Sequence, residues 1–339
     1  MERYCIKVPT KEAEKVRRIL LDNELLDGDF KIFSSTNFIF LPIVRLVPLQ
    51  LLKELQLSNQ IEVVKKEFDP IEKPPTLEGI LGFNPQHELI GNVAIIDSEI
   101  DQKKEVANAL LKAYPKLKTV VASKSPVQGE FRVKKYEFVK GECTTETVHK
   151  ENGCKFTLDL EKTYFTPRLA TERQRVASNV CKGDKVIDMF AGVGPYSILI
   201  AKSGLAEKIV AIDKNPNAIS YLKKNIKLNK VENIDAIEAD ARYLSSKYNG
   251  FADHIIMNLP HSAYEFLDSA ISMVKAGGII YYYTINPENN LFGASIKQIN
   301  ESCEKLGKEC IIKEERIVRS YAPHQYNICI EFRVNNDKV

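Results

Sequence analysis

The chain has 339 residues, of which 44% are hydrophobic and 27% charged, and its formal net charge at pH 7 is +3. These values are ordinary for a globular protein of two or three domains, and so small a charge means that any nucleic-acid surface must be local. No apolar run reaches the roughly 18 residues of a membrane span, and the N-terminus does not resemble a signal peptide. The seven cysteines are scattered without a C-x-x-C pair, so we expect reduced thiols, a cytoplasmic location and no zinc site.

Residues 1–68 are expected to form a small α/β domain. Apolar periodicity predicts a strand at 4–8, a helix at 11–26, a hairpin at 30–42, a helix at 49–57 and a strand at 61–68. The first helix carries cations that form either a basic face or an ordinary solvated surface: Lys11, Lys15, Arg17 and Arg18. Three prolines in the segment 69–76 predict a stiff linker that ends this domain.

A middle domain is expected over residues 77–165. Its pattern predicts a strand at 92–97, a helix at 102–113, a strand at 119–122 and a hairpin at 148–160. Between Lys124 and Lys140 five basic residues stand against two acidic ones, with aromatic residues between them. Such a segment is typical of a polynucleotide-binding surface, and an ordinary amphipathic strand is the alternative.

The stretch 185–201 is the centre of the C-terminal domain, which we place at 166–339. An apolar strand leads into Ala191-Gly-Val-Gly194 and then into an apolar helix, and a second strand ends at Asp213. Strand, glycine turn, helix, strand and acid are the elements of a nucleotide site in a doubly wound parallel sheet.

Two cofactor classes use this plan. A dinucleotide site favours a third glycine, but Ser197 stands at that position. Asp188 would repel a pyrophosphate, whereas it suits the ammonium group of S-adenosyl-L-methionine, whose ribose hydroxyls Asp213 can accept. The sequence therefore favours the methyl donor over a dinucleotide or an empty αβ turn.

The rest of the chain continues the sheet. Strands are predicted at 234–238, 254–257 and 279–284, with helices at 172–179, 217–228, 266–274 and 294–306. Thr171 is expected to cap the first of these helices and to place Glu172 near the mouth of the site. Strands at 315–321 and 326–334 are joined by four residues and must be antiparallel, as in the methyltransferase form of this fold.

Polar residues follow successive strands: Asp188, Asp213, Asp240 and Asn258. In open α/β sheets such positions lie at the ligand-binding edge. Asp240 can accept a hydrogen bond from an adenine amino group, and the amide of Asn258 can pair with a flat heterocycle. This order of residues indicates a methyltransferase that acts on a planar nitrogen.

A series of motifs runs through the chain in order: Gly129-Glu-Phe-Arg-Val133, Tyr164-Phe-Thr-Pro-Arg168-Leu…Glu172-Arg173, Asp188-Met-Phe-Ala-Gly-Val-Gly-Pro195, Asp213-Lys-Asn-Pro216, Asn258-Leu-Pro260 and Arg319-Ser-Tyr-Ala-Pro323. In these motifs, and over essentially its whole length, the chain resembles the archaeal tRNA (guanine-37-N1)-methyltransferases. The resemblance implies a class I, Rossmann-like methyltransferase sheet preceded by two smaller RNA-binding domains. It also implies S-adenosyl-L-methionine as donor, guanosine 37 of tRNA as target, an N-terminal domain that touches the outer corner of the tRNA, and a monomer.

The resemblance also assigns roles to residues. It implies Glu172 as general base, Arg132 as the group that stabilises O6 of guanine, and Asn258 as a base-positioning residue. The residues implied for cofactor binding are Arg173, Asp188, Phe190, Gly192, Gly194, Asp213, Lys214, Asp240, Ala241 and Asn258. Those implied for substrate binding are Tyr164, Phe165, Arg168, Pro260 and His261.

His261 departs from the family pattern, because many single-function members have Lys after Asn-Leu-Pro. A bifunctional archaeal branch, which also methylates C7 of 4-demethylwyosine at position 37, resembles the chain equally well. Two readings from other classes are a non-catalytic RNA-binding protein on a methyltransferase fold and a dinucleotide oxidoreductase. The complete set of strand-terminal residues argues against both.

Overall fold

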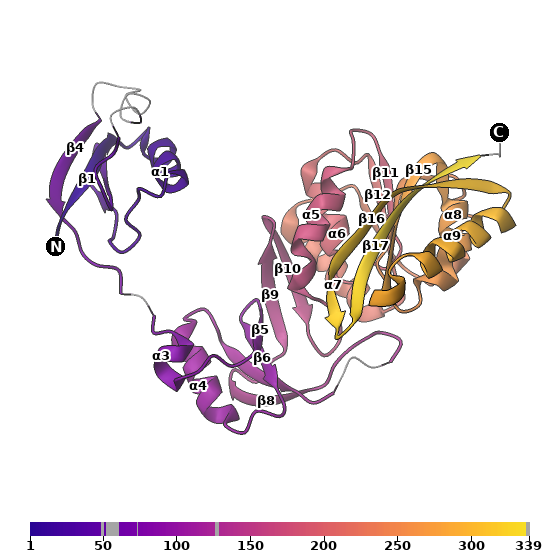
Figure 1. Ribbon diagram of the computed structural model, residues 1–339, viewed down its shortest axis with the longest axis horizontal. Helices are drawn as coiled ribbons and strands as arrows, with labels where there is room; N and C mark the ends of the chain where they lie inside the picture. The colour runs from indigo at the N-terminus through magenta and orange to yellow at the C-terminus, as the bar shows by residue number, and fades with distance from the viewer. Residues whose placement is uncertain (49–50, 52–60, 73, 126–128, 337–339) are drawn as a thin grey trace. The chain divides into compact units, whose positions relative to one another are not determined.

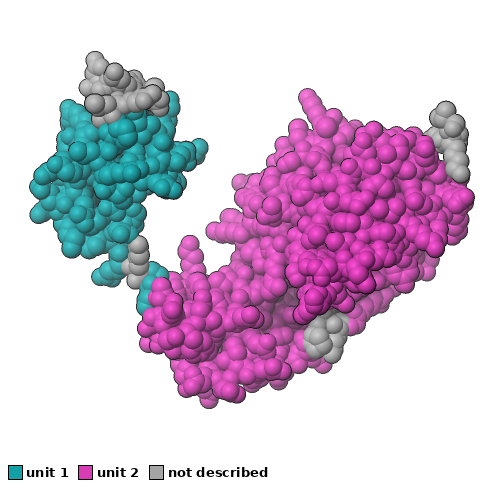
Figure 2. Space-filling model, in the orientation of Figure 1, with its two compact units in different colours: residues 1–75 teal, residues 76–339 magenta. Residues whose placement is uncertain are grey.

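The computed structural model describes residues 1–48, 51, 61–72, 74–125 and 129–336. The chain forms two compact units, Met1–Pro75 and Thr76–Val339 (Figures 1 and 2). The division falls within the proline-rich segment 69–76. No helix of the described residues is long and apolar enough to cross a membrane.

The first unit is an antiparallel sheet with helix α1 (Ala13–Asp22) packed on one face. The strands, in the spatial order β2-β3-β1-β4, are β1 (Glu2–Pro9), β2 (Phe33–Ser34), β3 (Phe38–Pro42) and β4 (Glu62–Glu67). Helix α1 (Ala13–Asp22) buries Val16 and Leu20 against Ile6 and Val8 of β1. The helix predicted at 49–57 falls largely outside the described residues.

The opposite face of this sheet carries aromatic rings and cations. The ammonium group of Lys66 lies 3.9 Å from the ring centroid of Phe33 and 4.9 Å from that of Phe40. Lys7 lies 4.6 Å from the ring of Phe38. Phe33 is exposed, so this face offers both ring surface and positive charge to solvent.

The second unit begins with a four-stranded sheet. Its strands, in the order β5-β6-β7-β8, are β5 (His87–Ile90), β6 (Val93–Asp97), β7 (Thr119–Ser123) and β8 (Tyr136–Gly141). Helix α4 (Lys103–Ala113) links the parallel pair β6 and β7 and buries Val106 and Leu110 against Val120. Helix α3 (Leu77–Leu81) and β5 were not predicted, because both are short and weakly periodic.

A hairpin joins this sheet to the larger one. Strands β9 (Glu146–Glu151) and β10 (Cys154–Asp159) turn at Asn152-Gly153, as predicted. The side chain of Asn225 in α7 (Pro216–Asn229) accepts a hydrogen bond of 2.7 Å from the backbone N–H of Thr157 and donates one of 3.0 Å to its carbonyl. These bonds tie the hairpin to the larger sheet within the compact unit Thr76–Val339.

The larger sheet has seven strands in the order β13-β12-β11-β14-β15-β17-β16. The strands are β11 (Lys185–Asp188), β12 (Lys208–Asp213), β13 (Ile234–Glu238), β14 (Ala252–Met257), β15 (Val274–Pro287), β16 (Lys308–Ala322) and β17 (Gln325–Asn336). The first five are parallel, and β17 lies antiparallel between β15 and β16. The predicted doubly wound sheet with an antiparallel terminal pair is confirmed (Figure 1).

Helices cover both faces of this sheet. One face packs against α5 (Ala170–Ser178), α6 (Pro195–Ser203) and α7, and the other against α8 (Leu267–Met273) and α9 (Gly293–Lys305). Thr171 does not cap α5, contrary to the prediction. A 3-10 turn at Pro167–Leu169 precedes the helix, and the hydroxyl of Thr166 accepts a hydrogen bond of 3.3 Å from the N–H of Arg168 at its start.

Candidate active site

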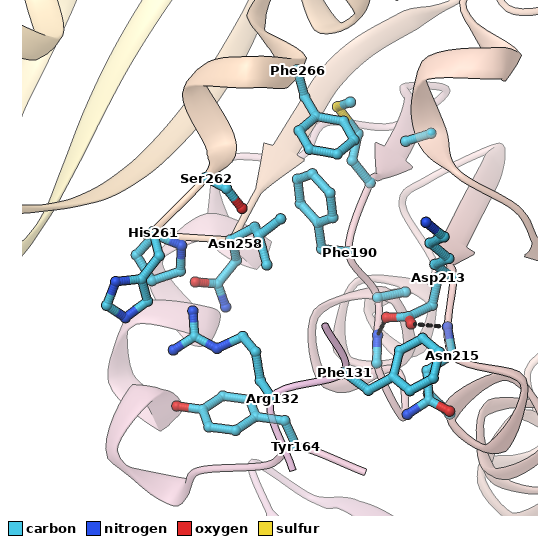
Figure 3. Close-up of a pocket in the computed structure, with 18 of the residues that line it drawn as sticks. Phe131, Arg132, Tyr164, Phe190, Asp213, Asn215, Asn258, His261, Ser262 and Phe266 are labelled. Carbon is cyan, nitrogen blue, oxygen red and sulfur yellow. Dashed lines mark hydrogen bonds between the residues drawn. The ribbon is translucent and has the colours of Figure 1, made fainter. Parts of the chain in front are cut away.

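A cavity of about 620 Å³ opens at the carboxyl ends of the central strands (Figure 3). Segments that follow β11, β12, β13 and β14 form its walls: 189–192, 213–215, 239–242 and 258–262. Residues 129–132, 164–166 and part of the β16–β17 hairpin complete it. The cavity thus occupies the position where open α/β sheets bind their ligands.

The turn after β11 is tied to the end of β12. Gly192 has a φ of +55°, a conformation that side chains rarely adopt, and its N–H donates a hydrogen bond of 2.7 Å to Asp213. The N–H of Asn215 donates one of 2.8 Å to the other oxygen of the same carboxylate. Burial raises the pKa of Asp213, and the residue lies on the cavity wall.

The end of β13 supplies a second carboxylate. Asp240 accepts hydrogen bonds of 3.0 and 2.7 Å from the guanidinium of Arg242, and these bonds lower its pKa. Nearby, the rings of Phe190 and Phe266 meet edge to face with centroids 4.9 Å apart (Figure 3). Acids beside an apolar slot suit a nucleoside, whose base is flat and whose sugar carries hydroxyls.

Arg132 lines the cavity, and two nitrogens of its guanidinium have no hydrogen-bond partner among the described residues. Its backbone has a φ of +54°, and its guanidinium carbon lies 5.2 Å from the ring centroid of Tyr164. Its Nε and Nη1 atoms are buried and make no hydrogen bond within the described chain. Figure 3 shows this guanidinium between Tyr164 on one side and Asn258 and His261 on the other. A strained backbone and an unpaired buried donor are both costly, and such costs are typical of ligand sites.

His261 adjoins the same guanidinium. Its Nε2 atom lies 3.3 Å from the hydroxyl of Tyr321, and the two rings meet edge to face with centroids 5.5 Å apart. Partial burial and the charge of Arg132 both lower the pKa of His261. The imidazole is therefore neutral at pH 7 and does not add to the positive charge of the cavity.

Arg173 lines the cavity, but its charge is already paired. Its Nε and Nη2 atoms donate hydrogen bonds of 2.7 and 2.6 Å to the carboxylate of Glu151 in β9, and both side chains are buried. Nη2 also donates to the carbonyl of Thr166 at 2.9 Å. Arg173 thus fixes the segment that carries Tyr164.

Most of the residues predicted for the site lie on the cavity wall: Arg132, Tyr164, Phe165, Arg173, Phe190, Gly192, Asp213, Lys214, Asp240, Ala241, Asn258, Pro260 and His261. Four others do not: Arg168, Glu172, Asp188 and Gly194.

Asp188 is fully buried behind the cavity. The hydroxyl of Ser197 in α6 donates a hydrogen bond of 2.7 Å to one of its oxygens, and burial raises its pKa to about 7. The cavity wall begins one residue later, at Met189, and the side chain of Asp188 points into the core. The expectation that Asp188 faces the ammonium group of a cofactor is therefore not met.

Gly194 and Arg168 contact other parts of the fold rather than the cavity. A Cβ atom on Gly194 would lie 2.3 Å from Leu222, so this glycine allows α6 and α7 to pack closely. Arg168 is exposed and lies 3.1 Å from Glu88 of β5, away from the cavity.

Glu172 lies in the first turn of α5 and is buried, rather than open at the mouth of the site as predicted. Both carboxylate oxygens accept hydrogen bonds from Arg175, at 2.6 and 2.9 Å. The hydroxyl of Tyr283 in β15 donates a further bond of 2.7 Å. These partners hold the carboxylate behind the cavity wall.

The β16–β17 hairpin adds a wall that the sequence reasoning did not assign. Arg319, Tyr321 and Asn327 line the cavity, and Asn327 is only 2% exposed with an unpartnered Oδ1 among the described residues. The motif at 319–323, which is part of the resemblance to the family, is the feature of the sequence that could have indicated this wall. Nothing marked Asn327, because its position depends on its register opposite Arg319 and Ile285.

Known proteins with the same architecture were found by comparison. The TRM5/TYW2 methyltransferase domain matches residues 147–312, and the tRNA methyltransferase 5 N-terminal domain matches residues 5–48. The chain is 41% identical to the tRNA (guanine(37)-N(1))-methyltransferase Trm5b of Pyrococcus abyssi, over 98% of this chain and 99% of that protein.

Solved structures agree with the sequence matches. A complex of aTrm5 with tRNALeu has a TM-score of 0.69 and 39% identity, and covers 98% of this chain and 99% of the other. Methanocaldococcus jannaschii TYW2, solved with AdoMet, has a TM-score of 0.61 and 29% identity over 74% of this chain and all of the other. With near-complete coverage at 41% identity, this chain belongs to the TRM5/TYW2 family of methyltransferases.

Proposed function

We propose that this protein is a tRNA methyltransferase that transfers a methyl group from S-adenosyl-L-methionine to N1 of guanosine 37. The observation that carries the proposal is the guanidinium of Arg132, whose buried Nε and Nη1 atoms have no hydrogen-bond partner among the described residues and which lies in the same cavity as the strand-terminal carboxylates Asp213 and Asp240. The activity is the one named for the Pyrococcus abyssi relative, which matches this chain from end to end.

The residues of the cavity fit the methyl donor. Asp213 offers oxygens to ribose hydroxyls, and Phe190 and Phe266 flank the space for a flat adenine. The positive φ of Gly192 keeps the backbone turn open beside them. When bound, S-adenosyl-L-methionine supplies an electrophilic methyl group on a sulfonium.

The opposite part of the cavity suits the target base. Guanine N1 carries a proton at neutral pH, so its removal must be coupled to stabilisation of negative charge at O6. Arg132 can donate to O6, Asn258 can pair with the edge of the base, and the ring of Tyr164 offers a stacking surface. A base in the anticodon loop is stacked, so it must be flipped to enter.

Glu172 is proposed as the acceptor of the N1 proton. It is a buried carboxylate beside the cavity wall, next in sequence to the wall residue Arg173. Its role requires that one oxygen leave a present partner, or that the hydroxyl of Tyr283 pass the proton on. His261, which is neutral and lies on the wall, is the alternative acceptor.

tRNA is the proposed partner of both compact units. In the second unit, Lys134 and Lys135 lie between the wall residue Arg132 and β8 and add positive charge near the entrance for a polynucleotide. In the first unit, the sheet face with Phe33 and Lys66 has the ring and charge chemistry that binds RNA. We propose that the protein acts as a monomer in the cytoplasm.

Mass spectrometry of tRNA incubated with the protein and S-adenosyl-L-methionine tests the function. The expected product is 1-methylguanosine at position 37, and a methyl group on another base or atom would contradict the proposal. A second incubation with tRNA that carries 4-demethylwyosine at position 37 tests the bifunctional alternative through the C7-methylated product. A protein that binds tRNA and donor but yields no product would be a non-catalytic family member.

A further inference from the structure

Arg175 connects helix α5 to the terminal hairpin of the sheet. Its Nη2 and Nε atoms bind both oxygens of Glu172 at 2.6 and 2.9 Å. Its Nη1 atom donates to Glu331 of β17 and lies 3.3 Å from Glu314 of β16. One guanidinium is thus shared among three carboxylates from three elements.

The buried members of this cluster carry a net negative charge. The side chains of Glu172 and Glu331 are 7% and 8% exposed, and Arg175 is 18% exposed. Glu314 is 38% exposed and has a second cation, Arg316. Inside the protein, therefore, two carboxylates share one guanidinium, and their sum is one negative charge.

Two further cations lie near the cluster: Arg173 is paired with Glu151, and Arg333, two residues from Glu331 on β17, forms no ion pair with these carboxylates among the described residues. The remaining ionisable groups that face the cluster are neutral. On β15, Tyr283 bonds to Glu172, and the guanidinium carbon of Arg175 lies 5.9 Å from the ring centroid of Tyr281. On β17, the sulfur of Cys329 lies 3.8 Å from Arg175, and Tyr196 of α6 lies beside Tyr283. Burial raises the pKa of Tyr196, Tyr281, Tyr283 and Cys329, so none of them carries charge at pH 7.

We propose that Glu331 is a positioning residue for proton removal, because by sharing Arg175 with Glu172 it leaves the pair one negative charge in excess. The inference depends on Glu172 being the general base. A guanidinium bound to a single carboxylate stabilises the anion and makes it a poor proton acceptor. A second carboxylate on the same guanidinium opposes this effect, because two like charges in a buried site favour uptake of one proton.

The proton balance of the step follows from this arrangement. The N1–H bond breaks, its proton passes to an oxygen of Glu172, and its electron pair remains on N1 to form the new bond to the methyl carbon. The bond between that carbon and the sulfonium sulfur breaks, and its electron pair stays on the sulfur of the departing thioether. The cluster then holds one protonated and one ionised carboxylate around Arg175 and has no net charge. The excess charge present before reaction is the charge that the transferred proton neutralises.

Single-turnover methyl transfer by Glu331→Gln, measured against pH, tests the inference. Loss of one negative charge lowers the proton affinity of Glu172, so the midpoint of the pH–rate curve should move down by roughly one pH unit. The rate on the plateau should fall about tenfold, because a weaker base drives proton transfer less. Affinities for S-adenosyl-L-methionine and tRNA should stay within about twofold, since Glu331 lines no part of the cavity.

Two further variants separate charge from structure. Glu314→Gln removes an exposed carboxylate from the same guanidinium and should leave the curve unchanged, while Glu331→Asp keeps the charge and should retain the wild-type midpoint. An unchanged midpoint in Glu331→Gln, or an equal shift in Glu331→Asp, would overturn the inference. If Glu172→Gln keeps its full rate as well, Glu172 is not the general base and the proposed function is wrong on this point. If Glu172→Gln loses its rate but Glu331→Gln behaves as the wild type, Glu172 remains the base and only the role proposed for Glu331 is wrong.

Discussion

The backbone N–H of Gly192 lies 2.7 Å from the carboxylate of Asp213, and this hydrogen bond joins the turn after β11 to the end of β12. The contact orients the carboxylate while leaving it on the cavity wall. An acid held in this way is prepared to accept further hydrogen bonds from a ligand without a cost for ordering its side chain.

Asp213→Ala should weaken the binding of S-adenosyl-L-methionine by about 1.5–3 kcal/mol, the scale of a hydrogen bond to a charged group. Titration calorimetry measures the change directly. Asp235→Ala is the matched control, because this carboxylate lies in β13 but pairs with Lys208 at the surface. Equal affinities for the wild type and Asp213→Ala would remove Asp213 from the cofactor site.

Arg132 combines a strained backbone with a side chain that is proposed to donate to O6 of guanine. Arg132→Gly should lower the rate of methyl transfer by about 10²–10³-fold, because it removes the donor proposed for O6. It should not lower the melting temperature, since glycine tolerates the φ of +54° and no buried partner loses its bond. Thermal unfolding checks the expected melting temperature, and single-turnover kinetics on the same preparation check the expected loss of rate.

Arg132→Lys is the accompanying variant. It keeps the charge but loses the planar guanidinium, so its rate should fall between those of the wild type and Arg132→Gly. A marked loss of stability in Arg132→Gly would show that the arginine supports the fold rather than the reaction.

The division after Pro75 predicts that residues 77–339 fold without the first unit. This truncated protein should bind S-adenosyl-L-methionine with the affinity of the full chain, because every described residue that lines the cavity belongs to the second unit. Its affinity for tRNA should fall, since the face with Phe33 and Lys66 is removed. Aggregation or loss of donor binding would show that the two units depend on one another.

The basic segment before β8 should contribute to tRNA binding through phosphates. Charge reversal of Lys134 and Lys135 together should reduce the slope of log affinity against log salt by roughly two units at most. Reversal of Lys223 and Lys224, which are exposed on α7, gives the same change in net charge. If both pairs flatten the slope equally, the effect reflects overall charge and the segment is an ordinary solvated surface.

Asp213 and Asn258 could be placed from the sequence because each follows a strongly apolar strand, and the carboxyl ends of parallel strands share one edge. Asp188 follows the same rule but lies one residue too early, so its side chain enters the core. The position of a side chain relative to a strand end thus depends on a shift of one residue, which sequence periodicity does not resolve.

The surroundings of Glu172 could not be predicted for a different reason. Its partner Tyr283 and the shared carboxylate Glu331 are 111 and 159 residues away in sequence, on strands whose register sets the contacts. The local pattern of apolar residues identifies helix α5 and its first turn, but it does not show which residues of distant strands contact Glu172. Asn327 was missed for the same reason.

Glu172→Gln tests the centre of the proposed mechanism. General-base catalysis contributes about 10²–10⁴-fold, so the variant should lose that much of the single-turnover rate. Binding of S-adenosyl-L-methionine and tRNA should remain close to normal, since the residue lies behind the cavity wall and glutamine preserves its shape. Binding assays on the same preparation provide the control.

The pH dependence distinguishes Glu172 from the other acceptor beside the cavity. With Glu172 as base, the wild-type rate should rise with pH to a plateau, and Glu172→Gln should lose this rise while His261→Asn retains it. His261 is neutral at pH 7 because burial and Arg132 lower its pKa, so as a base it would be active across the neutral range and lost only in acid. If Glu172→Gln keeps the full rate and His261→Asn does not, the proton leaves through the imidazole and Arg175 has only a structural role.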